Sequence, residues 1–290
     1  MFGSDVSLYV GPGADPFCAK ALETQLEKLL DTTVHPISRI TSFQDCSYDF
    51  QFCRALFVPG GSAAEMTRKL TQENLSEIRG ALSQHNVSYY GACAGAIFGA
   101  SKCCERVPEN RNCGFDNAFL RPFSATYLNA FPGTLLAPLF SRKIAEVSSD
   151  DVELITVQVG QNSFKSVFIR GPGFMNVDTV GGAEVISTFQ NPPPSLHIVD
   201  QKAGTWIEVD PEKKKTVSES VFYTKYGDSV CLTASHPEID SACVRSDLFR
   251  ETFHFSREAQ EMLASQLEVD EVARCQFLRK NFERLGLTVI

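Results

Sequence analysis

The chain has 290 residues, of which 43% are hydrophobic and 21% charged, and this composition excludes an intrinsically disordered protein. Its 27 basic and 35 acidic residues give a net charge of −8, so nucleic acid is not an expected partner. Its apolar runs are shorter than the roughly 18 residues that a membrane helix needs, and its first residues lack the pattern of a secretory signal. We therefore expect a cytoplasmic protein with no membrane contact, whose ten cysteines are reduced thiols.

The first half of the chain alternates between expected strands and helices. Short apolar runs that end at turn residues predict strands, and longer runs with one apolar face predict helices. The expected elements are strands at 6–10, 34–40, 55–58 and 87–90 and helices at 17–30, 70–82 and 93–100. This alternation is typical of an α/β fold with a mostly parallel sheet covered by helices on both faces.

The second half changes character. Short runs separated by turns predict antiparallel strands that extend the sheet, at 154–159, 166–169, 196–199, 205–209, 221–225 and 230–233. From about 246 to 285 the pattern is helical, with Gly286 as its C-terminal cap and an apolar face of Met262, Leu263, Leu267, Val272, Leu278, Phe282 and Leu285. We therefore predict a domain at 1–245 and a helical extension at 246–290 packed on it, while residues 103–152 give no clear pattern.

The strongest chemical pattern surrounds Cys93. Gly91 and Gly95 lie two residues before and two residues after it, between an expected strand and an expected helix. A nucleophile elbow needs this layout because the chain reverses so sharply that side chains at those two positions would collide. Unpaired amides at the start of a helix favour thiolate over thiol. The alternative interpretation is a buried structural cysteine at the start of a Gly/Ala-rich helix.

A nucleophilic cysteine needs a base, and the base needs a group that orients it. Of the five histidines, His236 alone follows an expected strand in a loop, where Pro237 and then Glu238 come next. We predict His236 as the base and Glu238 as the carboxylate that fixes its tautomer. The alternative is a simple turn with a solvated histidine.

A third pattern is Pro-Gly-Gly after the strand at 55–58. Backbone amides at Gly60 and Gly61, together with that of Ala94, are candidate oxyanion or substrate donors, although an ordinary turn has the same sequence. All three patterns follow strands, and open parallel sheets place their sites at the carboxyl ends of strands. Cys103, Cys104 and Cys113 lack a matched set of zinc ligands, so we expect neither a metal nor another cofactor.

These motifs together resemble the class I glutamine amidotransferase superfamily, and within it the amidotransferase-like N-terminal domain of biotin-protein ligases. The motifs are Tyr9–Gly13, Phe57–Gly61, Gly91–Ala96, Arg170–Gly173 and Ser235–Glu238. The resemblance implies a flavodoxin-like sheet and a triad of nucleophile Cys93, base His236 and orienting Glu238, with Gly61 and Ala94 as oxyanion donors.

The sequence also departs from that superfamily. Glutamine-hydrolysing members often carry a polar Gln four residues after the nucleophile, where this chain has Ile97. The Gly-Arg-Gly-Arg and Lys-Trp-Pro-Asn-Asp segments of the ligase half do not occur. We therefore expect no biotin transfer by this chain itself. A peptidase or deglycase relative would carry His directly after the nucleophile, where Ala94 lies.

Two hypotheses follow from these patterns. The first is a hydrolase or acyl transferase that forms a thioester on Cys93 from a small amide or acyl substrate. The second is a non-catalytic binding or regulatory module that kept the fold, linked to protein biotinylation. Either one is compatible with a separate ligase or synthetase protein as partner.

Overall fold

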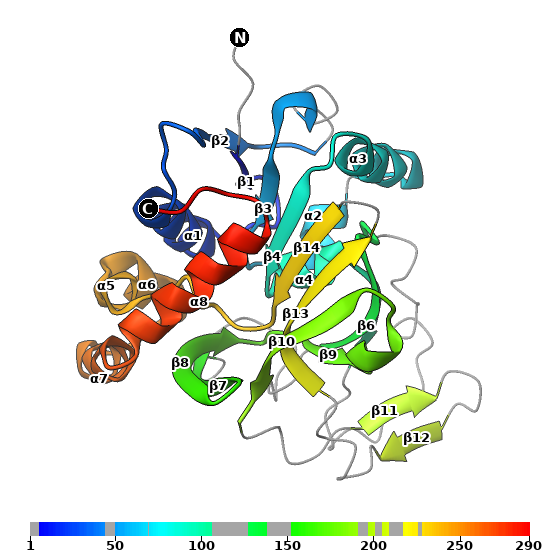
Figure 1. The fold of residues 1–290 in the computed structure, drawn as a ribbon. Helices are drawn as coiled ribbons and strands as arrows, with labels where there is room; N and C mark the ends of the chain where they lie inside the picture. Colours follow the sequence, from blue (N-terminus) through cyan, green and yellow to red (C-terminus); the bar gives the residue numbers. More distant parts are fainter. Residues whose placement is uncertain are drawn as a thin grey trace.

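The fold is centred on a mixed sheet with a parallel core, and it is known from a computed structural model (Figure 1). The structure describes residues 6–43, 50–68, 70–105, 127–137, 152–190, 197–200, 205–208, 217–225 and 228–290. In the order β2-β1-β3-β4-β14-β13-β10-β7-β8, the first five strands run parallel and the rest pair antiparallel. The predicted fold class is confirmed, including an antiparallel extension of the sheet. Two details of that extension were wrong. The strand expected at 230–233 pairs in parallel with the core, and those expected at 196–199 and 205–209 form a separate two-stranded sheet.

The elements of the first half follow the predicted alternation, with boundaries that shift by a few residues. The strands are β1 (Val6–Tyr9), β2 (Ile37–Ile40), β3 (Ala55–Val58), β4 (Ser88–Ala92) and β5 (Ala100–Glu105). The helices are α1 (Pro16–Leu29), α2 (Ala63–Thr67), α3 (Gln72–Gln84) and α4 (Ala94–Gly99), with a 3₁₀ turn at Phe50–Phe52. The strand predicted at 34–40 begins after Pro36, because proline lacks the amide that a paired strand donates.

The second half supplies the remaining strands and the last helices. The strands are β6 (Phe131–Ala137), β7 (Val152–Val159), β8 (Asn162–Ile169), β9 (Gly173–Met175), β10 (Ala183–Phe189), β11 (His197–Asp200), β12 (Thr205–Glu208), β13 (Val217–Lys225) and β14 (Asp228–Thr233). The helices are α5 (Ser241–Arg245), α6 (Asp247–Phe253), α7 (Arg257–Glu268) and α8 (Glu271–Arg284), with a 3₁₀ turn at Val177–Thr179. Residues 103–152, which gave no pattern, contribute β6 and the end of β5, and their residues 106–126 and 138–151 lie outside the described ranges.

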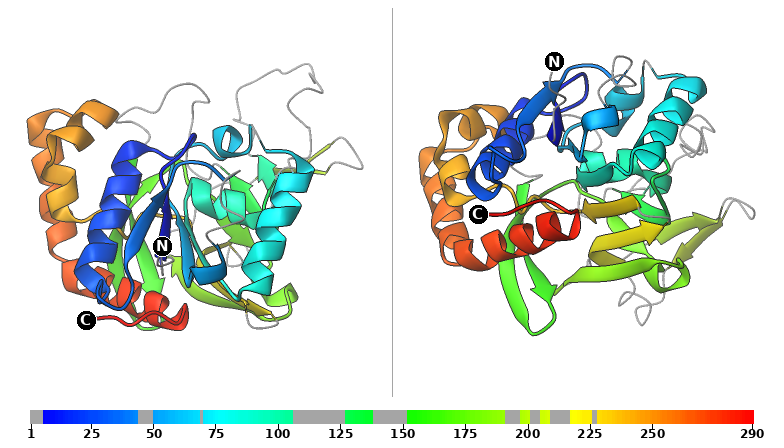
Figure 2. Two further views of the ribbon diagram at one scale, coloured as in Figure 1. Left: turned by 90° about the horizontal axis from the view of Figure 1, so that it is seen from above. Right: turned by 45° about the horizontal axis from the view of Figure 1, so that its top comes forward.

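Helices cover both faces of the parallel core, as Figure 2 shows from two sides. Leu22 and Leu26 of α1 and Phe282 of α8 pack on one face, against residues such as Phe57 of β3. Leu75, Ile78 and Leu82 of α3 share the opposite core cluster with Phe98 of α4. The carboxyl ends of the core strands therefore remain available for a site between these two layers.

The C-terminal helices share a core with the sheet. The ring of Phe282 lies edge-on to Phe57 and Tyr90, with centroid distances of 5.3 and 5.7 Å. Gly286 has a φ of +80°, which confirms the predicted cap. The predicted apolar face is wrong at Met262 and Val272, whose exposed fractions are 63% and 72%. These residues lie in two separate helices, and each of them lies off the buried face of its own helix.

No helix among the described residues is both long enough and apolar enough to cross a membrane. The domain boundary predicted at residue 245 stays a prediction.

Glu23 of α1 provides a test of the electrostatics of this fold. Its carboxylate accepts two hydrogen bonds of 2.7 Å from Arg39, which lower its pKa from an ordinary value near 4.5 to about 2 even though burial opposes this. Because the folded pKa is depressed, the stabilisation is present above about pH 4.5 and lost as the pH falls through about 2. We expect Glu23→Gln to lower the free energy of unfolding by about 1 kcal/mol at pH 7, since Arg39 is exposed and solvent screens the pair. Urea unfolding at pH 7 and pH 2.5 should show this difference shrinking at the lower pH, and a difference that grows there would contradict the assignment.

Candidate active site

Three neighbouring parallel strands bring the predicted motifs to one edge of the sheet. β4 pairs with β3 on one side and with β14 on the other. Gly60 follows β3, Cys93 follows β4 and His236 follows β14. The expectation that each motif follows the carboxyl end of a strand is confirmed, and the structure adds that the three strands are neighbours, as Figure 1 shows.

Cys93 lies on a strained turn between β4 and α4. Its φ of 51° and ψ of −107° are outside the regions that side-chain-bearing residues prefer, and its amide donates to Thr233 O at 2.9 Å. A Cβ on Gly91 would lie 2.6 Å from Gly95 O, and one on Gly95 would lie 2.1 Å from Val58 O. The two glycines are therefore required by backbone contacts, as the elbow interpretation predicts.

The imidazole of His236 is held by Glu238. Nδ1 lies 2.8 Å from Oε1 of Glu238, and the two side chains are 1% and 0% exposed. The solvated turn that was the alternative is thus excluded. Burial by itself lowers the pKa of His236, but its electrostatic interactions with Cys18, Glu238 and Cys93 outweigh burial and raise that pKa well above its usual value.

Cys18, in the first turn of α1, is a neighbour of His236 that sequence reasoning missed. A methyl group on Gly60 would lie 2.4 Å from Cε1 and 3.1 Å from Nε2 of His236, and 3.1 Å from Sγ of Cys18. Burial raises the pKa of the Cys18 thiol to about 12, although its hydrogen bond with His236 opposes the rise. Cys18 is therefore a buried thiol beside the His236 ring. Its contact with His236 depends on the packing of α1 against the turn at Gly60, which the local sequence does not show.

The sulfur of Cys93 is directed toward β8. Sγ donates to Ile169 O at 3.3 Å, and the amide of His236 donates to Val167 O at 2.8 Å. The end of β8 thus forms one wall beside both residues. Among the contacts of the described residues there is no direct hydrogen bond between Cys93 and His236, so the nucleophile must turn away from Ile169 before it can react with the help of the base.

The predicted oxyanion donors lie in the turn after β3 and at the start of α4. Gly61 has a φ of +142°, and a Cβ there would lie 2.0 Å from Gly13 O. The turn is held by the bond from Asp15 N to Gly60 O at 2.9 Å and the bond from Ser62 N to Gly13 O at 2.7 Å. Within the described part of the chain, the Gly61 and Ala94 amides take part in none of the bonds that hold these turns.

Ile97 is partly buried against the core, in the place where the resemblance expects a polar contact. The described His, Cys, Asp and Glu residues form no cluster of three that could hold a metal ion. Eight cysteines fall in the described ranges, and the seven of them whose side chains are described are free thiols. Cys104 lies in β5, where its side chain is not described, and Cys113 lies outside the described ranges.

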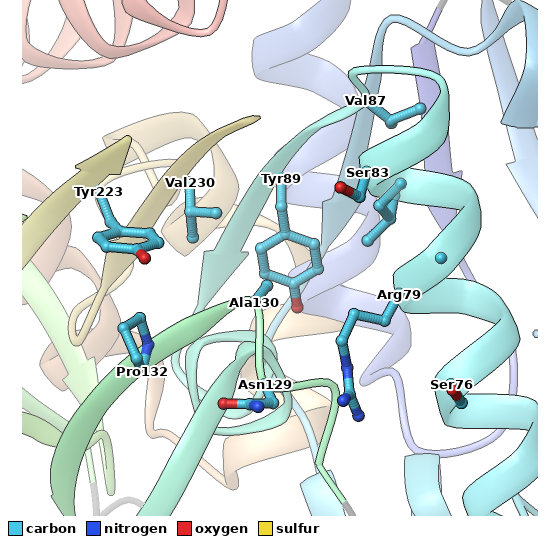
Figure 3. A pocket seen from close by; sticks show the side chains of 12 residues that line it. Ser76, Arg79, Ser83, Val87, Tyr89, Asn129, Ala130, Pro132, Tyr223 and Val230 are labelled. Atoms are coloured by element: carbon cyan, nitrogen blue, oxygen red, sulfur yellow. The ribbon is translucent and has the colours of Figure 1, made fainter. Parts of the chain in front are cut away.

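A cavity of about 440 Å³ lies at the other end of β4, where Val87 directly precedes that strand and Val230 lies near the start of β14. Figure 3 shows Tyr89 of β4 and Arg79 of α3 on its sides. The Tyr89 hydroxyl donates to Gly95 O at 2.7 Å, and burial keeps the pKa of that hydroxyl well above its usual value. Tyr89 thus lines the cavity and also holds the backbone of the elbow through its hydrogen bond to Gly95.

Comparison with known proteins decides the family. The family described as "Biotin-protein ligase, N terminal" matches residues 4–290. The chain belongs to this family. The biotin-protein ligase N-terminal family is thus confirmed as the more specific of the two resemblances in the sequence.

Relatives of this family member are distant in sequence but alike in fold. It is 22% identical over 187 residues to a probable pyridoxal 5'-phosphate synthase subunit PDX2 of Arabidopsis thaliana, a match that covers 64% of this chain and 65% of that protein, less than two thirds of its length. A crystal structure of a glutamine amidotransferase aligns with a TM-score of 0.52 at 17% identity, over 98% of this chain and 100% of the other. A glutamine amidotransferase from Thermotoga maritima aligns with a TM-score of 0.50 at 11% identity, over 98% of both chains. These structures establish a glutamine amidotransferase-like fold.

Proposed function

We propose that this protein is a cysteine-nucleophile amidase or acyl transferase in which Cys93, His236 and Glu238 act together. The observation that carries the proposal is the pairing of two features on adjacent strands. Cys93 is held in a strained turn after β4, and His236 is buried after β14 with Nδ1 bonded to a carboxylate. An oriented imidazole next to a thiol presented by a tight turn is the arrangement that nucleophilic catalysis needs.

The raised pKa of His236 fixes the direction of proton transfer. A protonated imidazole stabilises the Cys93 thiolate, which attacks the carbonyl carbon, and the Gly61 and Ala94 amides hold the oxyanion. The C–N bond then breaks and the leaving nitrogen takes the proton from Nε2. The neutral ring next takes a proton from water, whose hydroxide attacks the thioester. The carboxylic acid leaves, and the thiolate and imidazolium are restored.

The substrate class is a small amide or acyl compound. Glutamine is the reference amide because two solved glutamine amidotransferases share the fold. Ile97 removes a polar contact at a position where glutamine-hydrolysing relatives often use one, so we expect a preference for a less polar amide. The Arabidopsis relative is named as a subunit of a synthase, and a separate ligase or synthetase protein is the corresponding partner for this chain.

Alkylation of the ten cysteines tests the activated nucleophile. Cys18 is the internal control because it is equally buried, at 3% exposure against 5% for Cys93, and touches the same imidazole. We expect low iodoacetamide at pH 7 to label Cys93 at least about tenfold faster than Cys18, since the thiolate is the reactive form. Time-resolved peptide mapping by mass spectrometry measures both rates. If Cys93 reacts no faster than the other nine cysteines, the proposal fails.

A non-catalytic binding or regulatory module is the second candidate. Two observations favour it: the Cys93 thiol donates a hydrogen bond to Ile169 O, and the Cys18 thiol interacts with the His236 imidazole. In that case a folded Cys93→Ala variant keeps the biological activity of the chain, whereas the proposed hydrolase loses it. Complementation by this variant distinguishes the two.

A further inference from the structure

Glu219 of β13 is a buried carboxylate that the proposed mechanism does not use. It is 0% exposed, and in the described part of the chain no ion pair joins it. Oε1 accepts hydrogen bonds from the amide and the hydroxyl of Ser235, at 2.9 and 2.6 Å. Oε2 accepts from the Ser187 hydroxyl at 2.5 Å. A buried carboxylate with three donors and no cation needs an explanation, because its desolvation is costly.

The partners of Glu219 show what it holds. Ser235 immediately precedes His236, and the amide of Ala234 donates to Glu219 O at 2.8 Å. Ser187 reaches the carboxylate from β10, whose pairing with β13 is irregular on both sides of Ser187. Local irregularities of this kind re-aim a side chain, often next to a site. Glu219 of β13 is thus hydrogen-bonded to Ala234 and Ser235, the two residues that precede His236.

The position of His236 leaves little room for movement. Its ring is bonded to Glu238 on one side, and on the other even a methyl group on Gly60 would collide with Cε1. Its own amide is bonded to Val167 O at 2.8 Å. A shift of Ser235 would therefore break the bond to Glu238 or move Nε2 away from the reacting atoms, and a misplacement of 1 Å can cost about 100-fold in rate.

We propose that Glu219 is a positioning residue that fixes the direction of the His236 imidazole through the three hydrogen bonds that its carboxylate accepts, two from Ser235 and one from Ser187. The role rests on the proposed function of His236, but its geometric part can be measured independently. The length of the side chain is the property that matters, because both oxygens must reach their donors from β13.

Two conservative variants separate length from charge. Glu219→Gln keeps the length: its carbonyl accepts from Ser235, and its NH₂ donates to Ser187, whose hydroxyl then donates to Ser220, 2.5 Å away. Glu219→Asp keeps the charge but is one methylene shorter. We expect iodoacetamide to label Cys93 in Glu219→Gln at a rate within about threefold of that in the wild type. In Glu219→Asp we expect the labelling of Cys93 to be slower by about tenfold or more. Glu23→Gln is the matched control, since it also removes a carboxylate of low exposure but lies on α1, bonded to Arg39 and Lys20.

Imidazole NMR supplies the readout that does not depend on activity. The signal of the His236 Nδ1 proton is assigned by its loss in His236→Gln. Its chemical shift and pH titration should be unchanged in Glu219→Gln and Glu23→Gln. Both should change in Glu219→Asp. A folded Glu219→Asp with the wild-type signal, titration and alkylation rate would overturn the positioning role. If Cys93 is not preferentially labelled even in the wild type, the proposed function fails while the NMR comparison still decides the role of Glu219.

Discussion

Gly95→Ala is expected to lower the free energy of unfolding by about 3 kcal/mol, whereas Gly80→Ala is expected to raise it by about 1 kcal/mol. The added methyl group at Gly95 would lie 2.1 Å from Val58 O and 3.1 Å from Pro59 O. Both atoms belong to the backbone at the end of β3, so neither can rotate away. The contact can be relieved only if α4 moves from the sheet.

Gly80 is the matched control for this prediction. It lies in α3, where an added methyl group meets nothing within 4 Å, and alanine is a better helix former than glycine. Urea unfolding of the two variants measures the signs directly. Equal effects of the two substitutions would contradict the close packing of the elbow against β3. Because a displaced α4 also moves Cys93, we expect Gly95→Ala to lose the preferential labelling of that cysteine too.

The parallel core and its active edge are predictable because local patterns determine them. Local sequence alone predicts the buried strand at 55–58, which Gly60 and Gly61 follow. It also predicts the strand before Cys93, without information from distant residues. Parallel pairing then places the ends of these strands together. The sequence therefore predicted that Cys93 and His236 each follow a strand, but the parallel pairing of β14 with β4, which makes the two strands neighbours, is a result of the structure.

Contacts that depend on side-chain packing could not be predicted from the sequence. Nothing in the pattern around Cys18 shows that its thiol would face His236, since that contact requires the packing of α1 against the turn at Gly60. The bond from Cys93 to Ile169 O likewise depends on where β8 ends after its long hairpin. At Met262, helical periodicity predicted burial, but the face of α7 has no element to pack against there.

The elbow and the His236 loop are stabilised by different means. The elbow relies on missing side chains at Gly91 and Gly95, so its geometry tolerates no added volume. The loop relies on buried hydrogen bonds that the carboxylates of Glu219 and Glu238 accept, so its geometry depends on polar groups being satisfied. Substitutions at the two elbow glycines should therefore lower the stability through steric overlap at every pH. The effect of substitutions at Glu238 on stability should depend on pH.

Glu238→Gln is expected to be destabilising in a pH-dependent way. In the wild type the pKa of folded His236 is well above its usual value of 6.5, so the protonated pair stabilises the protein fully below pH 6.5 and less as the pH rises through the folded pKa. In the variant the carboxylate charge is gone, so one of the interactions that offset burial is lost and the pKa of the ring falls. The stabilisation that protonation of His236 gives the folded protein at low pH is therefore smaller in the variant.

We expect the variant to be less stable than the wild type by about 3 kcal/mol at pH 6, because a buried ion pair loses one partner. At high pH, where His236 is neutral in both proteins, the glutamine oxygen still accepts from Nδ1 and the difference should fall to about 1 kcal/mol. Urea unfolding in steps from pH 6 to pH 9.5 measures this change. Glu23→Gln serves as the control, since the pKa of Glu23 near 2 makes its effect constant over that range. A difference between wild type and Glu238→Gln that stays constant or grows with pH would show that the ring is neutral in the native protein, and the thiolate–imidazolium pair would then have no basis.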